Sequence, residues 1–314
     1  MAVKSIGMAF SREFTGDDPL AHIGIKNPIY RRFLEFCTIR GWNVYVLTRK
    51  TYKGAGIFEG SWKYKDGKFE AVKTPVKMDL VYDRTAGIKF PPEGDEGALW
   101  VNGRDFKILA WDKWVVYRVI GRYMPQTLLV EDEKDISAVV DQIKTDRVIL
   151  KPFNGLKGLG IFVGPKDEAK NFKFNPKYKR YIVQEFVDTS SGISGIAPGM
   201  HDLRVVIING EVVWCHVREP VGGSLLANAA QGGNLTEVDY GKVPESIKNI
   251  VEKVSKEFYK KYDNPIYSLD FGVGRNRVPK IFEINDQMGF PKWEMKNRDN
   301  FLNSLVNNIA DKLT

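Results

Sequence analysis

The sequence has few of the residues that build zinc sites, disulfide frameworks or membrane spans. It holds two cysteines and three histidines in 314 residues, and Cys37 and Cys215 lie far apart without forming a C-x-x-C pair. A structural zinc site and a disulfide framework are therefore not expected. No run of about 18 apolar residues occurs, and the first residues lack the apolar core of a signal peptide. We expect a soluble, cytoplasmic protein with no membrane partner.

The chain also lacks a strong excess of either charge sign. Its 47 lysines and arginines exceed its 39 aspartates and glutamates by 8, a modest bias that suits an anionic nucleotide or carboxylate ligand. Hydrophobic residues make up 43% of the chain, which is enough for a substantial core. The length favours about two domains, or one domain of two or three lobes.

Aromatic and basic residues alternate in one stretch, FEGSWKYKDGKFEAVK at 58–73. Such interleaving occurs in stacking platforms that bind single-stranded nucleic acid. The same alternation fits a twisted exposed hairpin with Asp66-Gly67 as its turn. We favour the hairpin and do not expect a nucleic-acid partner.

The N-terminal third of the chain alternates between strand and helix patterns. Strands are predicted at 4–10, 43–48 and 78–84, and an amphipathic helix at 27–41, where Gly41 ends it. This order is typical of a small parallel α/β lobe. In such a lobe, ligands bind beyond the carboxyl ends of the strands.

Two arginines of this lobe are candidates for substrate binding. Arg84 ends the strand pattern VYDRT, and Arg12 lies in the loop after the first strand. Each is also compatible with an ordinary loop residue. Arg84 is the stronger candidate for holding a carboxylate, because it falls at the edge of the sheet where ligands gather.

The remainder of the chain predicts a second lobe and then an antiparallel region. A helix is expected from Ala110 to Tyr123, followed by Pro125 and a β-branched run. Later strand patterns are joined by short Gly/Asn turns, which favours antiparallel sheet with helices. The strand-rich segments are 147–153, 160–164, 180–187, 202–219 and 266–286, and a further helix is expected at 244–262.

Glycines surround a lysine in NGLKGLG, which follows the strand pattern ILKP. Backbone N–H groups of such a loop can converge on phosphate oxygens, although an ordinary Gly-rich hairpin turn explains the glycines equally well. Lys151 favours a phosphate, because an ammonium at the end of a buried strand needs an anionic partner. A structural Asp or Glu could also fill that role.

Acidic side chains fall on two neighbouring strand patterns near the end of the chain. Alternation places Ile281, Glu283 and Asn285 on one strand face, and a GRNR connection puts Asp270 opposite Glu283 or one step away. Neither strand offers an evident cation, so we favour a divalent ion held by these oxygen ligands, Mg²⁺ or Mn²⁺. The alternative is a solvent-facing side neutralised by nearby basic residues, namely Arg275, Arg277 or Lys280.

The order of these motifs resembles the ATP-grasp superfamily of carboxylate–amine ligases, in particular the branch of ribosomal protein S6 glutamate ligase and bacterial glutathione synthetase. The resemblance spans about Asn102 to Pro291. It implies an α/β (α+β) ATP-grasp fold with a Rossmann-like pre-ATP-grasp lobe at 1–105. Two α+β lobes would then clasp ATP, one with the glycine flap at 106–187 and one with the metal site at 188–314.

The resemblance also implies roles for single residues. WDKW and MPQT are similar to the family's DK and P-x-T elements, so Lys113 and Lys151 would be the two ATP-phosphate lysines. HDLRVVIINGEVVWCHVRE is similar to the D-x-R…R hairpin, which makes Arg204 and Arg218 catalytic, and NAAQGG makes Asn228 a substrate residue. Flap and hinge would supply the other ATP contacts, Gly155, Lys157, Gly158, Gly160, Gln184, Glu185, Phe186, Val187 and Asp188. The implied ligands of two Mg²⁺ or Mn²⁺ ions are Asp270, Glu283 and Asn285.

The arginine hairpin allows a check on this assignment. A two-residue Asn209-Gly210 turn would put Arg204 and Arg218 on opposite faces, whereas a three-residue loop with a bulge would put both on one face. The family role requires the second arrangement.

The function implied is an ATP-dependent carboxylate–amine ligase that forms an amide through an acyl phosphate and gives ADP and phosphate. Two alternatives keep the fold: a small-molecule kinase of the inositol phosphate type, and a synapsin-like regulatory protein that binds ATP without turnover. The expected partners are small-molecule or peptide carboxylates and amines. The family also suggests a homodimer or homotetramer.

Overall fold

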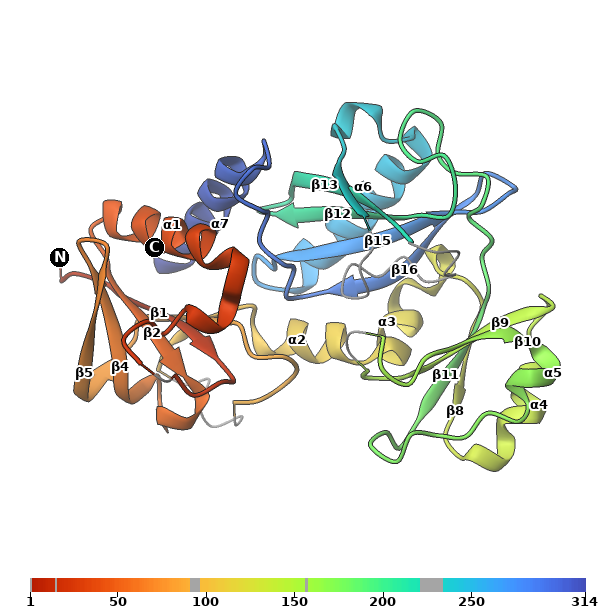
Figure 1. Ribbon diagram of the computed structural model, residues 1–314, viewed down its shortest axis with the longest axis horizontal. Helices are drawn as coiled ribbons and strands as arrows, with labels where there is room; N and C mark the ends of the chain where they lie inside the picture. The colour runs from red at the N-terminus through yellow and green to blue at the C-terminus, as the bar shows by residue number, and fades with distance from the viewer. Residues whose placement is uncertain (1, 15, 91–96, 156–157, 221–233) are drawn as a thin grey trace.

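The structure is a computed structural model that describes residues 2–14, 16–90, 97–155, 158–220 and 234–314. Its described strands form three sheets, and each sheet is the centre of one lobe (Figure 1). The lobe of the first sheet lies at the left of the view, the smallest sheet at the lower right and the third sheet above it. No helix in the described ranges is both long enough and apolar enough to cross a membrane.

The first sheet is built around β1 (Ser5–Phe10). Its parallel neighbours are β2 (Asn43–Thr48) and β6 (Leu80–Asp83), and α1 (Asn27–Ile39) connects β1 with β2. Gly41 follows the helix with a φ of +80°, the left-handed conformation that ends helices. The predicted parallel α/β lobe is therefore confirmed.

Other strands extend this sheet on both sides. β7 (Leu99–Val101) pairs in parallel with β6, whereas β3 (Tyr52–Gly54), β4 (Ile57–Lys65) and β5 (Lys68–Lys77) are antiparallel. The β4–β5 connection is Asp66-Gly67, with φ of 49° and 77°, as a tight hairpin turn requires. The hairpin predicted over 58–73 is thus confirmed.

The second sheet has the strand order β10-β9-β11-β8 and antiparallel pairing. Two short helices, α4 and α5, pack beside it and share its core. The bounds are β8 (Thr127–Val130), α4 (Ile136–Asp141), β9 (Arg147–Pro152), β10 (Phe162–Pro165), α5 (Lys166–Ala169) and β11 (Tyr181–Glu185).

The third sheet is antiparallel throughout, as the sequence predicted, with the order β14-β13-β12-β15-β16. Helix α6 packs its apolar side into the core beneath this sheet. The bounds are β12 (Asp202–Ile208), β13 (Glu211–Glu219), β14 (Asn234–Glu237), α6 (Glu245–Lys261), β15 (Tyr267–Val273) and β16 (Pro279–Asn285).

The helix predicted from Ala110 to Tyr123 is wrong in its bounds. The structure has two helices there, α2 (Arg104–Trp111) and α3 (Lys113–Ile120), separated by the extended residue Asp112. The Asp112 carboxylate accepts hydrogen bonds from the backbone N–H groups of Trp114 (2.9 Å) and Val115 (3.1 Å). Aspartate is a favoured N-cap, so it starts a new helix.

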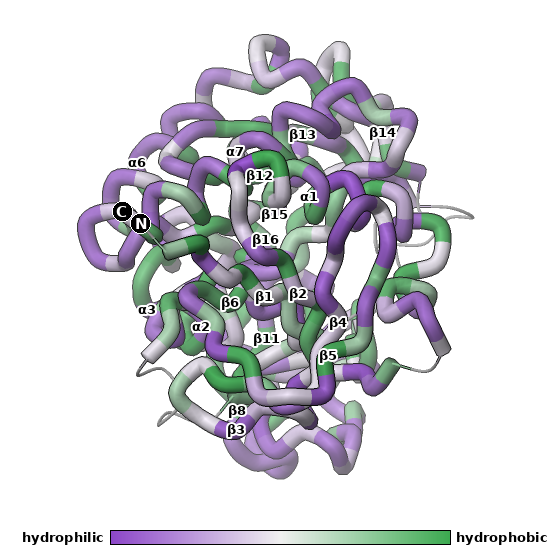
Figure 2. The backbone as a smooth tube through the Cα atoms, turned by 90° about the vertical axis from the view of Figure 1, so that its left-hand side faces the viewer, coloured by the Kyte–Doolittle hydropathy of each residue, from purple (hydrophilic) through white to green (hydrophobic). Residues whose placement is uncertain are grey.

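The C-terminal helix α7 (Arg298–Leu313) returns to the first lobe and packs beside α1 (Figure 1). Its apolar residues share one core with the first sheet and with one end of the β12–β13 hairpin. Hydrophobic stretches lie mainly where the chain runs through the interior, and the outer turns are mostly hydrophilic (Figure 2). The domain boundaries at 105 and 187 stay a prediction.

Candidate active site

A pocket of about 670 Å³ lies where the three lobes meet. Lys26 and Gly87 of the first lobe line it, together with Lys151 of the second sheet and Asp270 of the third. The pocket is therefore not built by any one sheet, and all three lobes contribute to its lining.

Two lysines enter the pocket from different elements. Lys151 on β9 is buried, and its Nζ donates to Gln184 Oε1 at 3.0 Å and to the Phe282 carbonyl at 3.2 Å. Lys113 starts α3, donates to the Gly155 carbonyl at 2.9 Å and forms an ion pair with Glu283 at 3.1 Å. Lys113 is thereby held at the glycine loop, and Lys151 is held between β11 and β16.

The pKa of Lys151 is lowered to about 8, first by burial and also by Lys113, while Glu283, Asp270 and Asp202 oppose the shift. No described Asp or Glu forms a direct ion pair with Lys151, since its hydrogen-bond partners are neutral oxygens. The alternative of a structural acid paired with this lysine therefore has no support in the described part of the chain.

The glycine loop borders the pocket through Gly155 and Gly158. Gly158 and Gly160 have φ of 76° and 74°, a backbone conformation that a residue with a Cβ rarely adopts. A Cβ on Gly160 would also lie 2.9 Å from the Tyr181 hydroxyl. The predicted contact of Lys157 falls outside the described residues.

The predicted hinge contributes only part of its residues to the pocket. Gln184, Phe186 and Val187 line it. Glu185 accepts a hydrogen bond from the Gln126 backbone at 3.2 Å instead. Asp188 forms an ion pair with Arg275 at 2.8 Å and does not line the pocket, so its assignment to ATP stays a prediction.

The arginine hairpin has a turn and a bulge at once. Asn209-Gly210 is a two-residue turn with φ of 55° and 78°, the arrangement expected to separate the two arginines. A β-bulge at Val213 shifts the register beyond the turn, so that Arg204 pairs with His216 and Asp202 with Arg218. Both arginines consequently lie on one face, and the expectation for a two-residue turn is wrong because an extra residue changes the strand parity.

Both arginines bind Asp270 on the adjacent strand. Arg204 donates to the two carboxylate oxygens through Nε and Nη2, each at 2.6 Å, and Arg218 Nη2 donates to Oδ2 at 2.8 Å. Burial alone would raise the pKa of Asp270, but the two guanidinium groups outweigh it and hold the pKa well below its ordinary value. The neutralising cations thus come from β12 and β13, and not from Arg275, Arg277 or Lys280.

Asp202 is a pocket residue to which the sequence analysis gave no role. It forms an ion pair with Arg218, and its Oδ1 is buried with no hydrogen-bond partner among the described residues. Burial, and then the nearby Asp270 carboxylate, raise the pKa of Asp202. The D-x-R spacing of HDLR was the sequence signal that could have found it.

The acidic pair is confirmed, with one correction. Asp270 lies opposite Glu283 in the β15–β16 register. A bulge at Phe282 breaks the alternation, so Ile281 packs in the core with Ile284 and does not share the face of Glu283.

The described residues contain no cluster of three or more His, Cys, Asp or Glu side chains that could hold a metal ion. Asp270, Glu283 and Asn285 nevertheless line the pocket together. Asp270 Oδ2 accepts from Arg204, Arg218 and Asn285, whereas its Oδ1 accepts from Arg204 alone among the described residues. Each carboxylate oxygen offers two lone pairs, so the set fits a hard divalent ion completed by phosphate oxygens and water.

The predicted substrate residues do not meet in the pocket. Arg84 donates to the hydroxyl groups of Tyr82 (3.0 Å) and Tyr30 (3.1 Å) and does not line the pocket. Arg12 is exposed and is also absent from the lining. Asn228 falls outside the described residues. Lys26, Trp214 and His216 do line the pocket. The sequence patterns assigned no binding role to these three residues.

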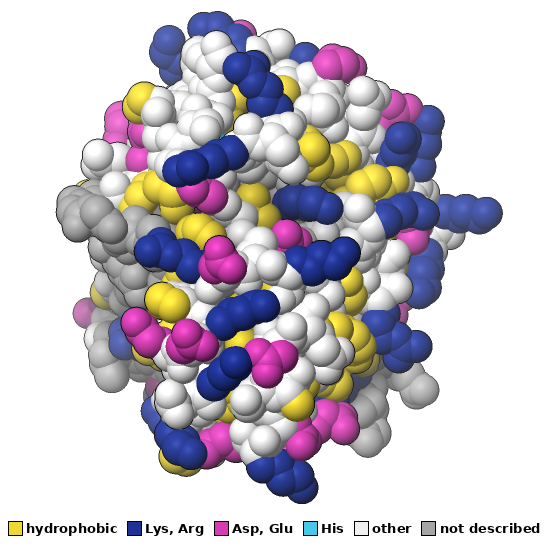
Figure 3. All heavy atoms as spheres, turned by 90° about the vertical axis from the view of Figure 1, so that its right-hand side faces the viewer, with side chains coloured by type: hydrophobic (Ala, Val, Ile, Leu, Met, Phe, Trp, Pro, Cys, Tyr) yellow, Lys and Arg dark blue, Asp and Glu magenta, His cyan; other side chains and the backbone are white. Residues whose placement is uncertain are grey.

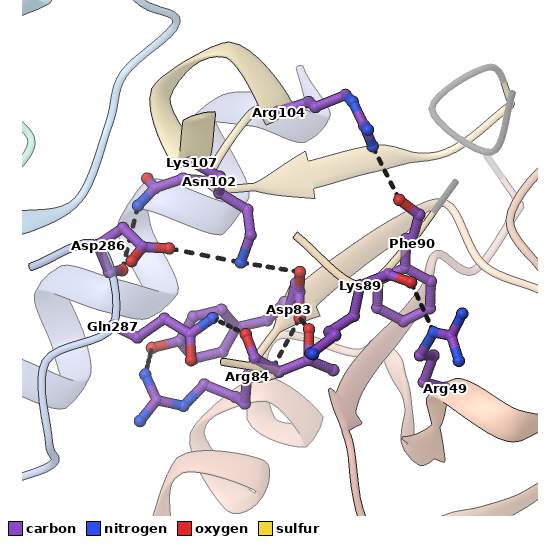
Figure 4. A network of polar contacts seen from close by, with 12 residues as sticks. Arg49, Asp83, Arg84, Lys89, Phe90, Asn102, Arg104, Lys107, Asp286 and Gln287 are labelled. Atoms are coloured by element: carbon purple, nitrogen blue, oxygen red, sulfur yellow. Dashed lines mark hydrogen bonds and ion pairs between the residues drawn. The ribbon is translucent and has the colours of Figure 1, made fainter. Parts of the chain in front are cut away.

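A buried polar network supports the acidic strand from behind (Figure 4). Lys107 on α2 forms ion pairs with Asp83 at 2.8 Å and Asp286 at 3.4 Å. Asn102 donates to the carbonyls of Ile266 (2.6 Å) and Asp286 (3.2 Å). The residue that follows Asn285 is thereby attached to the first lobe.

Comparisons with known proteins show the family of the chain. The model of the RimK-like ATP-grasp domain matches residues 106–309, more than half of the chain. A curated relative, the probable alpha-L-glutamate ligase of Rhodopirellula baltica, is 27% identical over 133 residues. That match covers 40% of this chain and 31% of the relative, so the chain spans about a third of the relative's length.

Solved structures show the same fold over nearly the whole chain. D-alanyl-alanine synthetase A from Vibrio cholerae superimposes with a TM-score of 0.65 at 14% identity, covering 100% of this chain and 99% of that one. A RimK domain protein ATP-grasp from Sphaerobacter thermophilus gives a TM-score of 0.62 at 13% identity, covering 98% and 99%. The predicted fold class is therefore confirmed.

Proposed function

The chain belongs to the RimK-like ATP-grasp family, as the resemblance predicted, and from this membership we propose that it is an ATP-dependent carboxylate–amine ligase. One observation carries the proposal. A single pocket brings two lysines beside a glycine loop together with two carboxylates and two arginines from another sheet. Phosphate-binding and carboxylate-binding groups are thus within reach of one bound substrate pair.

In the proposed reaction, a carboxylate oxygen attacks the γ-phosphorus of ATP, and the bond to the β-phosphate oxygen breaks to release ADP. The amine nitrogen then attacks the carbonyl carbon of the acyl phosphate, loses a proton and displaces phosphate. Lys113 and Lys151 neutralise the transferring phosphoryl oxygens. Arg218 and Arg204 hold the carboxylate and the oxyanion that develops from it.

Other pocket residues complete the proposed site. Gln184, Phe186 and Val187 receive the adenine, and the glycine loop covers the phosphates and excludes water from the acyl phosphate. Asp270, Glu283 and Asn285 would hold two Mg²⁺ or Mn²⁺ ions, which supply charge neutralisation at the phosphates.

The proposed substrates are small-molecule or peptide carboxylates and amines. Cytoplasmic localisation and a homodimer or homotetramer belong to the same proposal and rest on the family resemblance.

The test is phosphate release from ATP with Mg²⁺, measured across pools of amino acids, dipeptides and polyamines, with mass spectrometry of the products. ADP, phosphate and a product one water lighter than the summed substrates would support the ligase. A product heavier by a phosphoryl group would replace it with the kinase alternative. ATP binding without consumption in any pool would favour the regulatory alternative.

A further inference from the structure

The end of the pocket that faces the first lobe has its own cation. Lys26 closes the 3-10 segment η1 (Ala21–Lys26), directly before α1. The lysines assigned to the phosphates come from other elements, α3 and β9. Gly289 lies beside the Lys26 ammonium, and His216 is close enough for Lys26 to lower its pKa. Trp214, whose ring lies 4.1 Å from that of His216, lines the same pocket.

The ammonium of Lys26 is incompletely paired within the described chain. Its Nζ donates to the Phe290 carbonyl at 2.7 Å, and no described carboxylate lies within ion-pair distance of it. An ammonium has three N–H donors, so two are available to a ligand. Arg204 and Arg218, which line the pocket from the third sheet, differ from Lys26 because each is paired with an acid.

The charges around Lys26 are also positive. The pKa of Lys26 is lowered to about 8, first by burial and then by the positive charges of Arg84, Lys292 and Arg204. His216 adds no charge, since burial, and then Arg204, Arg218 and Lys26, hold its pKa well below its ordinary value. Unpaired positive charge in a partly buried site is costly, and a bound anion would remove that cost.

The surroundings of Lys26 also leave space for an anion with an apolar body. Gly289 has no side chain, and a Cβ there would lie 3.1 Å from Lys26 Nζ, which would crowd the ammonium. Trp214, 4% exposed, and Leu235 add apolar surface to the lining of the same pocket. A carboxylate on an amino acid or peptide fits both features, because its oxygens accept the free N–H groups while its side chain contacts the apolar surface.

We propose that Lys26 binds a non-reacting carboxylate of the amino acid or peptide substrate at this end of the pocket. The inference rests on the proposed ligase function and adds to it a residue that binds the substrate through a second carboxylate. Lys26 is a binding residue for that carboxylate, whereas Arg204 and Arg218 are the groups proposed to hold the reacting carboxylate.

The experiment is a thermal shift titration with Mg-ADP present throughout. The probes are two equimolar mixtures, one of amino acids and dipeptides with free carboxyl groups and one of the same compounds as C-terminal amides. The proteins are the wild type, Lys26→Met, Lys26→Arg and the control Lys256→Met, whose lysine is exposed on α6 and does not line the pocket.

We expect the free-carboxyl mixture, and not the amides, to stabilise the wild type and the control equally. Lys26→Met should weaken the apparent affinity for the mixture by about tenfold or more, the value of a charge-assisted hydrogen bond, and Lys26→Arg should retain most of it. Equal stabilisation by both mixtures, an unchanged affinity of Lys26→Met, or no stabilisation of the wild type would each overturn the inference. Absence of an Mg-ADP shift in the wild type would instead overturn the proposed function.

Discussion

Among the single residues of the pocket, Glu283 is the accessible acid. Its side chain is 36% exposed, and one oxygen pairs with Lys113 at 3.1 Å. Its ion-pair partner among the described residues is Lys113, and its side chain is partly exposed, so Glu283→Ala should leave the fold intact and remove a proposed ligand of the divalent ion. We expect Mg²⁺-dependent ATP turnover to fall by roughly a hundredfold or more.

Phosphate release in the presence of a stimulating substrate pool measures this effect. Glu294→Gln is the matched control, because Glu294 is an exposed acid that does not line the pocket. Turnover of Glu283→Ala at the wild-type rate would remove Glu283 from the site.

Lys26 predicts a pH dependence of substrate binding. Its pKa of about 8 is set first by burial and then by Arg84, Lys292 and Arg204, with the neutral His216 also facing this end. A carboxylate binds the protonated form, so affinity for the free-carboxyl mixture should be highest below pH 8 and fall as the pH rises through 8. Lys26→Arg should lose this decline, since a guanidinium stays charged.

Titrations of the mixture between about pH 6.5 and about pH 9.5 measure this decline. The range brackets the pKa of Lys26, which is about 8. A decline of equal size in Lys26→Arg would assign the pH dependence to another group.

At the scale of elements, single-residue bulges in two strands determine which side chains face the pocket. The bulges at Val213 and Phe282 decide which residues of β13 and β16 face the pocket. Alternation in the sequence predicts the strands correctly, but a bulge adds one residue without a distinct pattern. Which face of β13 carries Arg218, five residues beyond the bulge at Val213, is therefore known only from the observed register.

The break between α2 and α3 gives a testable prediction about stability. Asp112 caps α3 through two backbone N–H groups. Asp112→Ala should lower the free energy of unfolding by about 1 kcal/mol, whereas Asp112→Asn keeps an oxygen acceptor and should lose less. Urea unfolding of both variants measures the difference, and equal stability of Asp112→Ala and the wild type would show that the cap is not used.

At the scale of the whole molecule, the Lys107 ion pairs join the first lobe to the acidic strand. Lys107 is 8% exposed, and its partners Asp83 and Asp286 come from segments about 200 residues apart (Figure 4). Lys107→Met leaves two acids near one another without their cation. We expect it to lower the free energy of unfolding by about 3–5 kcal/mol.

The double variant Lys107→Met, Asp83→Asn separates loss of the pair from loss of packing. It should recover part of the stability, because one of the two unpaired charges is then absent. Chemical denaturation of the wild type, both single variants and the double variant forms a complete cycle. No recovery in the double variant would mean that Lys107 acts through packing only.

The face of the molecule shown in Figure 3 carries both positive and negative side chains. Lysine and arginine side chains alternate with aspartate and glutamate over this face. Neighbouring charges of opposite sign cancel locally. The uncompensated positive charge that matters for the proposed substrate is instead inside the pocket, around Lys26.

The sequence by itself determined the elements and the order of the motifs. Strand and helix periods are local, so the parallel first lobe, the antiparallel third sheet and the pairing of Asp270 with Glu283 could all be predicted. The tertiary structure alone decided which charges meet: Asp270 is neutralised by Arg204 and Arg218, while Arg84 is directed at tyrosines and Lys26 is left for a ligand. The physical reason is that electrostatic pairing depends on distance in space, and these groups come from segments that only the packing of three lobes brings together.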